Sequence, residues 1–542
     1  MSSSPRRSKI IAALAALTAC VSLLPAAAHS VTCAAPTVYG GDWRQIANQP
    51  TGDRVQDQER RLDPLSVALM EPAWTFDANR WTLMQNNEIT GYPIVADGCV
   101  YAGSSLATFG TSGWVFAINA DTGELVWRTK TKGGVYSTVA VDDGKVYAFV
   151  SRVSSPYVVA LDQRDGSVIW ERTVDFQVGS DAVSSPVVYD GMVWVGISGT
   201  AAEVNEGDRS TFQGNQVLLD ATTGQLLKKT YTIPEEDWKD PVTGDTFSGG
   251  AVWSTISVDP QTSYGYVGTG NPFDYDNEYP TTNSILKMDL ARARTPEGAP
   301  IPSPSITNPS FGKIVGSYKG EVEEYFPETA ESAPCQEMEE ISGLFAAGLE
   351  CLQLDLDFGA MPNIFTDATG RKLVGAGQKS GVYHAVDAET MKPVWKSLLG
   401  VPSPVGGIVG SAAYDGKNLY GPHTIGSYLW SIKKNDGGLN WVAPVGSGIN
   451  WGPPVTYANR ILFTVDLAGF LDAYGINGEP LLHRPLMLGS DTRERLPLSW
   501  GGVTVARGMA FVSAGVGLTS AGLPSLPSGF VIAFRPGRIP TP

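Results

Sequence analysis

Short apolar runs that end in a polar turn recur along this chain. The run Ala117-Ile118-Asn119-Ala120-Asp121-Thr122-Gly123 is followed by Trp127, and similar runs lie at 160–166, 218–224, 385–387 and 431–437. Trp170, Trp395 and Trp441 follow the second, fourth and fifth of these runs. A period of roughly 40 to 50 residues is typical of stacked supersecondary units, and this combination of strand, Asp/Gly turn and tryptophan is typical of β-propeller blades. We therefore expect a propeller built around one axis.

A second turn pattern allows the blades to be counted. A turn such as Asp-Gly followed by alternating apolar residues marks the entry into a strand. Clear copies begin at Asp97, Asp143 and Asp190, and weaker copies begin at Asp259, Asp367, Asp415, Asn459 and Arg507. The count predicts an all-β, eight-bladed β-propeller. A seven-bladed propeller with one false copy is the alternative.

The bulk composition agrees with one large all-β body. The 542 residues include 61 Gly and 37 Pro for turns, and 42% are hydrophobic. We expect an N-terminal segment at 31–90 that closes the propeller, and the propeller itself at 91–542 with an acidic insertion at about 290–350. The formal net charge of −16 argues against nucleic acid as a partner, because a phosphate backbone requires a basic surface.

The first thirty residues are typical of an export signal. Arg6, Arg7 and Lys9 precede an apolar run, and small residues follow up to Ser30. The sequence therefore predicts a signal peptide at 1–30, a secreted or periplasmic protein, and no transmembrane span in the mature chain. The segment Leu17-Thr18-Ala19-Cys20 also fits a bacterial lipobox, so a lipid anchor at Cys20 stays open as an alternative.

Cysteines and histidines limit the chemistry that the chain can support. Four cysteines remain beyond Cys20, and an even number suits an oxidising compartment. Cys335 with Cys351, and Cys33 with Cys99, are the pairs we favour, although spacing alone does not fix the connectivity. No Cys-x-x-Cys-His motif is present for a c-type haem, and the few histidines offer little material for a histidine-rich zinc site.

Long interruptions of the repeat carry the most specific signal. The segment Gly249-Gly250-Ala251-Val252-Trp253-Ser254 precedes a strand that ends in Gly268-Thr269-Gly270-Asn271-Pro272. Here the chain resembles the pyrroloquinoline quinone (PQQ) dehydrogenases, a family of eight-bladed quinoproteins that includes alcohol and polyvinyl-alcohol dehydrogenases. The resemblance implies that Trp253 forms a flat floor under the quinone and that Asn271 ligates a calcium ion. A further blade tryptophan is the alternative for Trp253.

A second segment is most similar to the polyvinyl-alcohol dehydrogenase branch. It contains Asp355-Leu356-Asp357-Phe358-Gly359 and then Gln378-Lys379-Ser380-Gly381. The resemblance implies that Asp355 or Asp357 acts as general base and metal neighbour, and that Lys379 hydrogen-bonds the quinone carbonyls. A carboxylate can take an alcohol proton, and a fixed cation stabilises charge that grows on the quinone oxygen. Aspartates that merely cap a loop are the alternative.

A third segment completes the site that the resemblance implies. Glu203 follows the stretch Gly196-Ile197-Ser198-Gly199 and is our candidate for the carboxylate ligand of calcium, with Glu206 and Asp208 as competitors. The implied metal set is Glu203, Asn271, Asp355 and Asp357, in keeping with the oxygen ligands that calcium prefers. The implied cofactor-binding set is Trp253, Lys379, Glu203, Asn271, Asn450 and Trp451. An Asp-x-Asp pair also holds trivalent ions in some quinoproteins, so a lanthanide stays open.

The resemblance implies a calcium-dependent PQQ enzyme that oxidises an alcohol to a carbonyl compound. Polyvinyl alcohol or another secondary alcohol is the expected substrate, and an external acceptor such as a cytochrome c takes the electrons. The chain departs from the family pattern in three ways: it has no adjacent Cys-Cys pair, Met361 stands where a small residue is expected, and Gln213 replaces an arginine. The alternative is a non-catalytic propeller that serves as a scaffold or binding protein.

Overall fold

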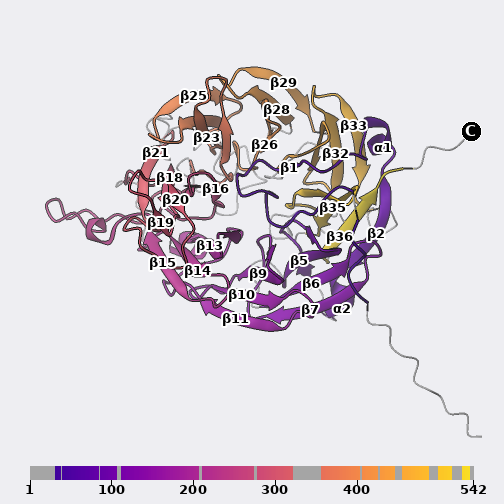
Figure 1. Cartoon of the computed structure of the whole chain (residues 1–542), viewed down its shortest axis with the longest axis horizontal. Helices are drawn as coiled ribbons and strands as arrows, with labels where there is room; N and C mark the ends of the chain where they lie inside the picture. The colour runs from indigo at the N-terminus through magenta and orange to yellow at the C-terminus, as the bar shows by residue number, and fades with distance from the viewer. Residues whose placement is uncertain are drawn as a thin grey trace, which may run out of the picture.

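The computed structural model describes residues 31–537 except 38, 83, 85, 107–111, 207–209, 274–277, 322–355, 403–405, 425–427, 446–453, 488–497 and 516–527. Within these residues, eight sheets of four principal strands are arranged as blades around one axis (Figure 1). The predicted eight-bladed, all-β propeller is therefore confirmed, and the seven-bladed alternative is wrong.

The blades follow one another along the chain. Blade 1 consists of β4 (Ile94–Ala96), β5 (Cys99–Leu106), β6 (Gly113–Asn119) and β7 (Leu125–Thr131). Blade 2 consists of β8 (Ala140–Asp142), β9 (Lys145–Val150), β10 (Tyr157–Asp162) and β11 (Val168–Thr173). Blade 3 consists of β12 (Val187–Tyr189), β13 (Met192–Ile197), β14 (Asn215–Asp220) and β15 (Leu226–Tyr231). Blade 4 consists of β16 (Ser257–Asp259), β17 (Tyr264–Gly268), β18 (Ser284–Asp289) and β21 (Ile314–Lys319).

The other half of the ring repeats this order. Blade 5 consists of β22 (Asn363–Thr366), β23 (Lys372–Gly377), β24 (Val382–Asp387) and β25 (Pro393–Leu398). Blade 6 consists of β26 (Ala413–Tyr414), β27 (Asn418–His423), β28 (Tyr428–Lys433) and β29 (Leu439–Pro444). Blade 7 consists of β30 (Thr456–Ala458), β31 (Ile461–Val465), β32 (Phe470–Gly475) and β33 (Pro480–Pro485). Blade 8 consists of β34 (Val503–Ala506), β35 (Met509–Ala514), β36 (Phe530–Arg535) and β2 (Glu71–Asp77).

The two ends of the chain close the ring. Strand β2, from the N-terminal part, pairs antiparallel with β36 and forms the outer strand of blade 8, with Glu71 opposite Arg535. These two side chains also form an ion pair of 2.8 Å. Strand β1 (Val55–Gln56) adds to blade 7 by parallel pairing with β30. Because the last blade takes a strand from the start of the chain, the propeller cannot open at this seam without breaking a complete strand pair.

Few elements lie outside the blades. They are α1 (Pro64–Ala68), α2 (Ala78–Thr82), α3 (Thr200–Glu206), the 3-10 turn Glu235–Asp237, β3 (Asn87–Glu88), and the hairpin of β19 (Ala293–Arg294) and β20 (Pro300–Ile301). Strand β3 pairs with β5, and the hairpin lies between β18 and β21 of blade 4. Among the described residues, no helix has the length and apolarity needed to cross a membrane.

The recurring tryptophans connect neighbouring blades. Trp127, on the outer strand of blade 1, donates a 2.9 Å hydrogen bond from Nε1 to the carbonyl of Gln163 in blade 2. Trp74 makes the same contact from blade 8 to Ala120 of blade 1, at 3.0 Å. Trp170, Trp395 and Trp441 make equivalent contacts with the blade that follows each of them. In these five blades, the repeated tryptophan therefore holds the outer strand against the next blade.

The glycine of the motif is required by this contact. Gly166 has a φ of +72°, and a Cβ atom added there would lie 2.5 Å from the indole of Trp127. A side chain would meet both the steric restriction of positive φ and the docked ring. The Asp/Gly turn and the tryptophan therefore recur together because they form one interblade contact.

A disulfide joins the N-terminal segment to the first blade. Cys33 and Cys99 are bonded, which confirms one of the two pairs we favoured, and they are separated by 66 residues. The other pair, Cys335 with Cys351, lies outside the described residues.

We expect Cys33→Ser to lower the free energy of unfolding by roughly 2–4 kcal/mol, because the cross-link restricts a long loop in the unfolded chain. Cys33 is the better choice than Cys99, whose side chain is fully buried. Chemical denaturation of the variant and of the oxidised parent measures the difference. The prediction is wrong if the two proteins have the same midpoint while the parent remains oxidised.

Candidate active site

The topology brings the predicted site residues to one face of the propeller. In every blade the second strand runs antiparallel to its neighbours, so the C-terminal ends of all second strands lie on the same face. Glu203 lies in α3 after β13, Asn271 follows β17, and Lys379 follows β23. Trp253 and Asp357 precede the first strands β16 and β22, which begin at that same face. Blades 3, 4 and 5 therefore contribute jointly to one site.

Asp357 is the centre of this group. Its Oδ2 atom accepts a 2.6 Å hydrogen bond from Trp253 Nε1 and lies 3.3 Å from Lys379 Nζ. Its Oδ1 atom accepts a 2.5 Å hydrogen bond from the backbone N–H of Asn271. The Asp357 side chain is 6% exposed and that of Lys379 is 11% exposed. Bulk water therefore screens this ion pair weakly.

Glu203 and Asn271 extend the group toward blade 3. Asn271 Nδ2 donates a 3.4 Å hydrogen bond to Glu203 Oε1, and Asn271 is almost fully buried. The two glycines before Asn271 allow the strand end to approach Asp357. A Cβ atom at Gly268 would lie 2.1 Å from the carbonyl oxygen of Phe358, and one at Gly270 would lie 3.2 Å from Asp357 Oδ1. This explains the Gly-x-Gly-Asn pattern as a close backbone approach.

Lys379 and Gly359 are close neighbours of the Trp253 indole. Lys379 Nζ lies 5.2 Å from the ring centroid, within cation–π range. Gly359 touches the other end of the indole, since a Cβ atom there would lie 1.9 Å from Trp253 Cη2. Trp253 is not one of the outer-strand tryptophans that join blades, because it lies in the loop between β15 and β16. Its hydrogen bond to Asp357 and these contacts fix the ring in one orientation.

A cavity of about 430 Å³ borders Trp253 and Gly359. Its size is within the range of small-molecule sites. Its walls include Met361 and Trp500 together with side chains from blades 1 to 3, among them Thr138 and Ser185. Met361, which departs from the pattern of the resembling family, thus narrows this cavity.

Three hydroxyl groups on the cavity wall were not predicted from the sequence. Thr138 Oγ1 accepts from Tyr92 N at 2.9 Å, Ser185 Oγ from Thr138 N at 3.1 Å, and Thr255 Oγ1 from Ser185 N at 3.1 Å. Each hydroxyl joins two successive blades through its oxygen, and its own O–H remains a donor for a molecule in the cavity. A Ser/Thr dipeptide shortly before the first strand of blades 2, 3 and 4 was the available signal.

Two residues beside the cavity each have a buried polar atom without a partner among the described residues. These atoms are Ser137 Oγ and Asp181 Oδ2. Burial raises the pKa of Asp181, even though Ser151 and the N–H of Ala182 donate to its other oxygen.

Gln378 and His384 hold the loop that carries the site. Gln378 Nε2 donates to the carbonyl of Leu356 at 2.7 Å, directly before Asp357, and Gln378 directly precedes Lys379. The Gln378 Oε1 atom lies 2.9 Å from His384 Nε2, and His384 Nδ1 lies 3.0 Å from the Tyr318 hydroxyl. Burial, with a smaller contribution from Lys396, lowers the pKa of His384 to about 3. The imidazole is therefore neutral and serves to position Gln378.

This buried histidine predicts a pH dependence of stability. Its pKa is lower in the folded state than the usual value of 6.5, so the unfolded chain binds the proton first as the pH falls. The stability that neutral His384 contributes is thus present above about pH 6.5 and is lost progressively toward pH 3. We expect His384→Gln to lose less stability than the parent between pH 7 and pH 5, by roughly 2 kcal/mol. Denaturation midpoints at both pH values measure this, and equal losses in both proteins would contradict it.

The donor set fits a hard cation and an acidic cofactor. The group contains two carboxylates, from Glu203 and Asp357, and one amide, from Asn271. Lys379 is the one cation that the hydrogen bonds and ion pairs described above place in the group. Oxygen donors of this kind are those that calcium prefers. The hydroxyl donors across the cavity suit carboxylate groups of a bound molecule. The residues present therefore fit both groups that the sequence analysis implied.

Several predicted residues lie outside the described residues. These are Asp355, Asn450, Trp451, Asp208 and Cys20. The side chain of Glu206 is likewise not described. The roles of these residues stay predictions, and Asp357 is the candidate general base whose side chain is described.

Eight blades with this axial group define the chain as a quinoprotein-type propeller. A family model described as outer membrane protein assembly factor BamB matches residues 68–230. The chain is 30% identical to polyvinylalcohol dehydrogenase of Sphingopyxis sp. (strain 113P3) over 74% of its own length and 58% of that protein. It is 26% identical to polyvinylalcohol dehydrogenase of Pseudomonas sp. over 61% of its length and 49% of that protein. The chain is thus a homologue of PQQ-type alcohol dehydrogenases, which confirms the resemblance.

A solved structure shows the same fold. The quinohemoprotein alcohol dehydrogenase from Comamonas testosteroni superimposes with a TM-score of 0.65 at 17% identity, over 92% of this chain and 82% of that one. The chain spans about half to three fifths of the length of the two polyvinylalcohol dehydrogenases, since it covers 58% and 49% of them.

Proposed function

We propose that this protein is an exported, PQQ- and calcium-dependent dehydrogenase that oxidises an alcohol to a carbonyl compound and passes the electrons to an external acceptor. The observation that carries the proposal is the set of contacts at Asp357, which joins Trp253, Asn271 and Lys379 at the edge of a cavity. A scaffold has no need for a buried lysine and carboxylate beside a fixed indole, since buried ion pairs contribute little to stability.

Each side chain has a defined role in this proposal. Trp253 offers the flat surface on which PQQ would lie, and Thr138, Ser185 and Thr255 would donate to its carboxylates. Glu203, Asn271 and Asp357 would ligate calcium. When bound, PQQ accepts the two electrons released by the alcohol, and calcium acts as a Lewis acid on its carbonyl group.

Asp357 is the proposed general base. An alcohol gives up two protons and two electrons when it becomes a carbonyl compound, and the proton of its hydroxyl group would move to the Asp357 carboxylate. Lys379, 3.3 Å from that carboxylate and above the Trp253 ring, supplies positive charge at the edge of the cavity. This charge stabilises negative charge that develops on a neighbouring oxygen.

The proposed substrate is a secondary alcohol, and polyvinyl alcohol is the first candidate. The names of two homologues support this choice. The test is dye-linked oxidation by mature protein reconstituted with PQQ and calcium, with polyvinyl alcohol, a short secondary alcohol and a primary alcohol in parallel. We expect turnover of the secondary alcohols that requires both additions. Turnover of primary alcohols alone would overturn the substrate assignment, and no turnover of any alcohol would overturn the enzymatic one.

A scaffold role is the second candidate function. It is favoured by the family model for an assembly factor, which matches residues 68–230. That match ends before Trp253 and the site residues of blades 4 and 5. Failure to bind PQQ under any metal condition would favour the scaffold.

A further inference from the structure

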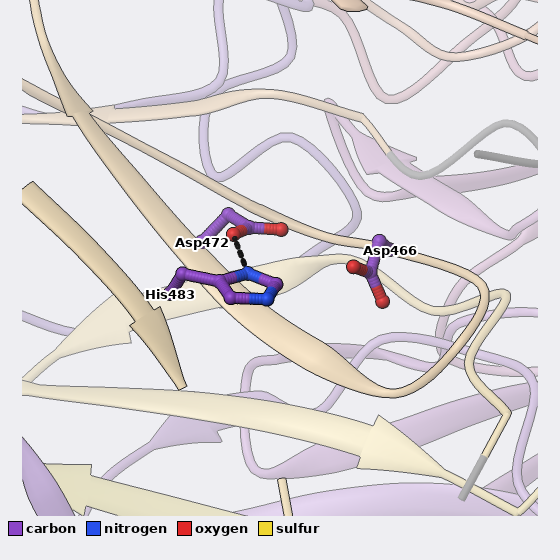
Figure 2. A group of neighbouring side chains, drawn as sticks. All are labelled: Asp466, Asp472 and His483. Carbon is purple, nitrogen blue, oxygen red and sulfur yellow. Dashed lines mark hydrogen bonds and ion pairs between the residues drawn. The ribbon is translucent and has the colours of Figure 1, made fainter. Parts of the chain in front are cut away.

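A second cluster of metal-ligating side chains lies in blade 7, outside the site described above. Asp466 is in the turn after β31, Asp472 is on β32, and His483 is on β33 (Figure 2). One potential ligand atom from each of the three lies within 4.8 Å of the other two. The turn after β31 follows a second strand, so the cluster lies on the same face of the propeller as the candidate active site, but in a blade that contributes none of the described residues of that site.

Two carboxylates are buried together in this cluster. Asp466 is fully buried and Asp472 is 1% exposed. Asp472 Oδ1 lies 2.7 Å from His483 Nδ1, and Asp466 Oδ1 accepts a 2.9 Å hydrogen bond from the N–H of Phe470. The two carboxylates thus lie buried beside each other, and His483 is paired with Asp472.

An unused ligand atom points to what the cluster binds. Asp472 Oδ2 is buried and has no hydrogen-bond partner among the described residues. In Figure 2 the carboxylate of Asp472 lies beside the His483 ring, with Asp466 facing both across the space between them. A purely structural Asp–His pair would leave this oxygen unsatisfied, at a cost that native proteins normally avoid. A cation among the three side chains would satisfy it.

We propose that Asp466, Asp472 and His483 form a binding site for a first-row divalent metal ion of the Zn²⁺ type. The ligands are two carboxylate oxygens and one imidazole nitrogen, which matches the mixed donors of zinc sites with three protein ligands and an open position for water. Calcium fits poorly, because it requires six or more oxygen ligands. The His483 side chain is 44% exposed, which gives the ion an entry path and leaves one side open to solvent.

Binding would tie three parts of blade 7 together. His483 stacks on Phe470, with ring centroids 4.3 Å apart and an interplanar angle of 7°. A bound ion would add a link from this stacked pair to the β31–β32 turn through Asp466. The ion would therefore stabilise the folded state by a free energy that rises with the logarithm of its concentration relative to its Kd.

The test is zinc binding by tag-free, metal-stripped protein without PQQ, measured by titration calorimetry and by metal content after dialysis. We expect one equivalent of Zn²⁺ and a rise in thermal midpoint of about 2 °C or more with excess zinc. Asp466→Asn and His483→Gln should each weaken binding at least about tenfold and abolish the thermal rise. Cobalt(II) should give visible absorption bands that change in His483→Gln.

Controls separate this site from the proposed cofactor site and from nonspecific binding. Glu203→Gln and the exposed turn variant Asp436→Asn should keep the zinc equivalent and the thermal rise. Unchanged zinc affinity in both Asp466→Asn and His483→Gln would overturn the proposal. So would loss of the zinc equivalent in Glu203→Gln, which would assign the ion to the other site. Because no PQQ or alcohol is used, the result is independent of the proposed function.

Discussion

Asp357→Asn is expected to lower kcat for alcohol oxidation by a factor of about 10³, within the usual range for loss of a general base. Asparagine has nearly the same shape, but its single side-chain oxygen can accept from only one of Trp253 Nε1 and the N–H of Asn271, which bond to different oxygens of Asp357. It cannot take a proton from the substrate, and it removes the partner of Lys379. Steady-state kinetics with PQQ-loaded protein measures the change, and PQQ binding by fluorescence shows whether the site still forms.

A matched control is available in the same propeller. Asp259 is also buried and is also paired with a lysine, Lys372, at 2.6 Å. It is the last residue of β16, directly before the turn to β17, at the opposite face from the site. Asp259→Asn should leave kcat within about twofold of the parent value, because a substitution remote from the active site acts mainly on stability. If Asp357→Asn retained kcat to the same extent as this control, Asp357 would not be the base.

Gly359→Ala is expected to weaken PQQ binding by at least about tenfold, which corresponds to about 1.4 kcal/mol. The new methyl group would lie 1.9 Å from Trp253 Cη2, so the indole must leave the position in which it donates to Asp357. Overpacking of this kind typically costs about 1–3 kcal/mol. Fluorescence titration with PQQ measures the affinity, and near-ultraviolet circular dichroism reports the displaced indole.

Gly316→Ala is the control for the glycine substitution. Its added Cβ would lie 3.0 Å from Met391 Cγ, which is part of a flexible side chain and can move. This variant should bind PQQ as the parent does. Equal affinities in Gly359→Ala and the parent would show that the fixed position of Trp253 is not needed for binding.

The fold could be predicted because its determinants are local and repeated. The Asp-Gly turns before the second strands of blades 1 to 3, such as Asp97-Gly98 and Asp143-Gly144, have positive φ at both positions, and this restricts the residue types. The repeat of such turns therefore gave the correct count of blades. The contact between Trp127 and Gly166 could not be deduced from the pattern, because it joins residues of different blades.

The candidate site was predictable only in part. The resemblance singled out Trp253, Asn271, Asp357 and Lys379, and the structure brings these four together. It could not distinguish Asp357 from Asp355, because that choice depends on which carboxylate faces Trp253. The support from Gln378 and His384 depends on side-chain contacts across a sheet, for which a single sequence carries no signal.

The blade 7 cluster shows the same limit. Asp466, Asp472 and His483 are spread over one turn and two strands, with no short motif that marks a metal site. Their proximity depends on strand register, since Asp472 is directly opposite His483 in the pairing of β32 with β33.

The most direct test of the proposed function is a PQQ titration of metal-stripped mature protein with and without calcium, followed by tryptophan fluorescence. We predict saturable quenching that requires calcium and that is lost in Trp253→Ala and strongly weakened in Lys379→Ala. Absence of PQQ binding under both metal conditions would contradict the quinoprotein assignment and leave a propeller with a different role.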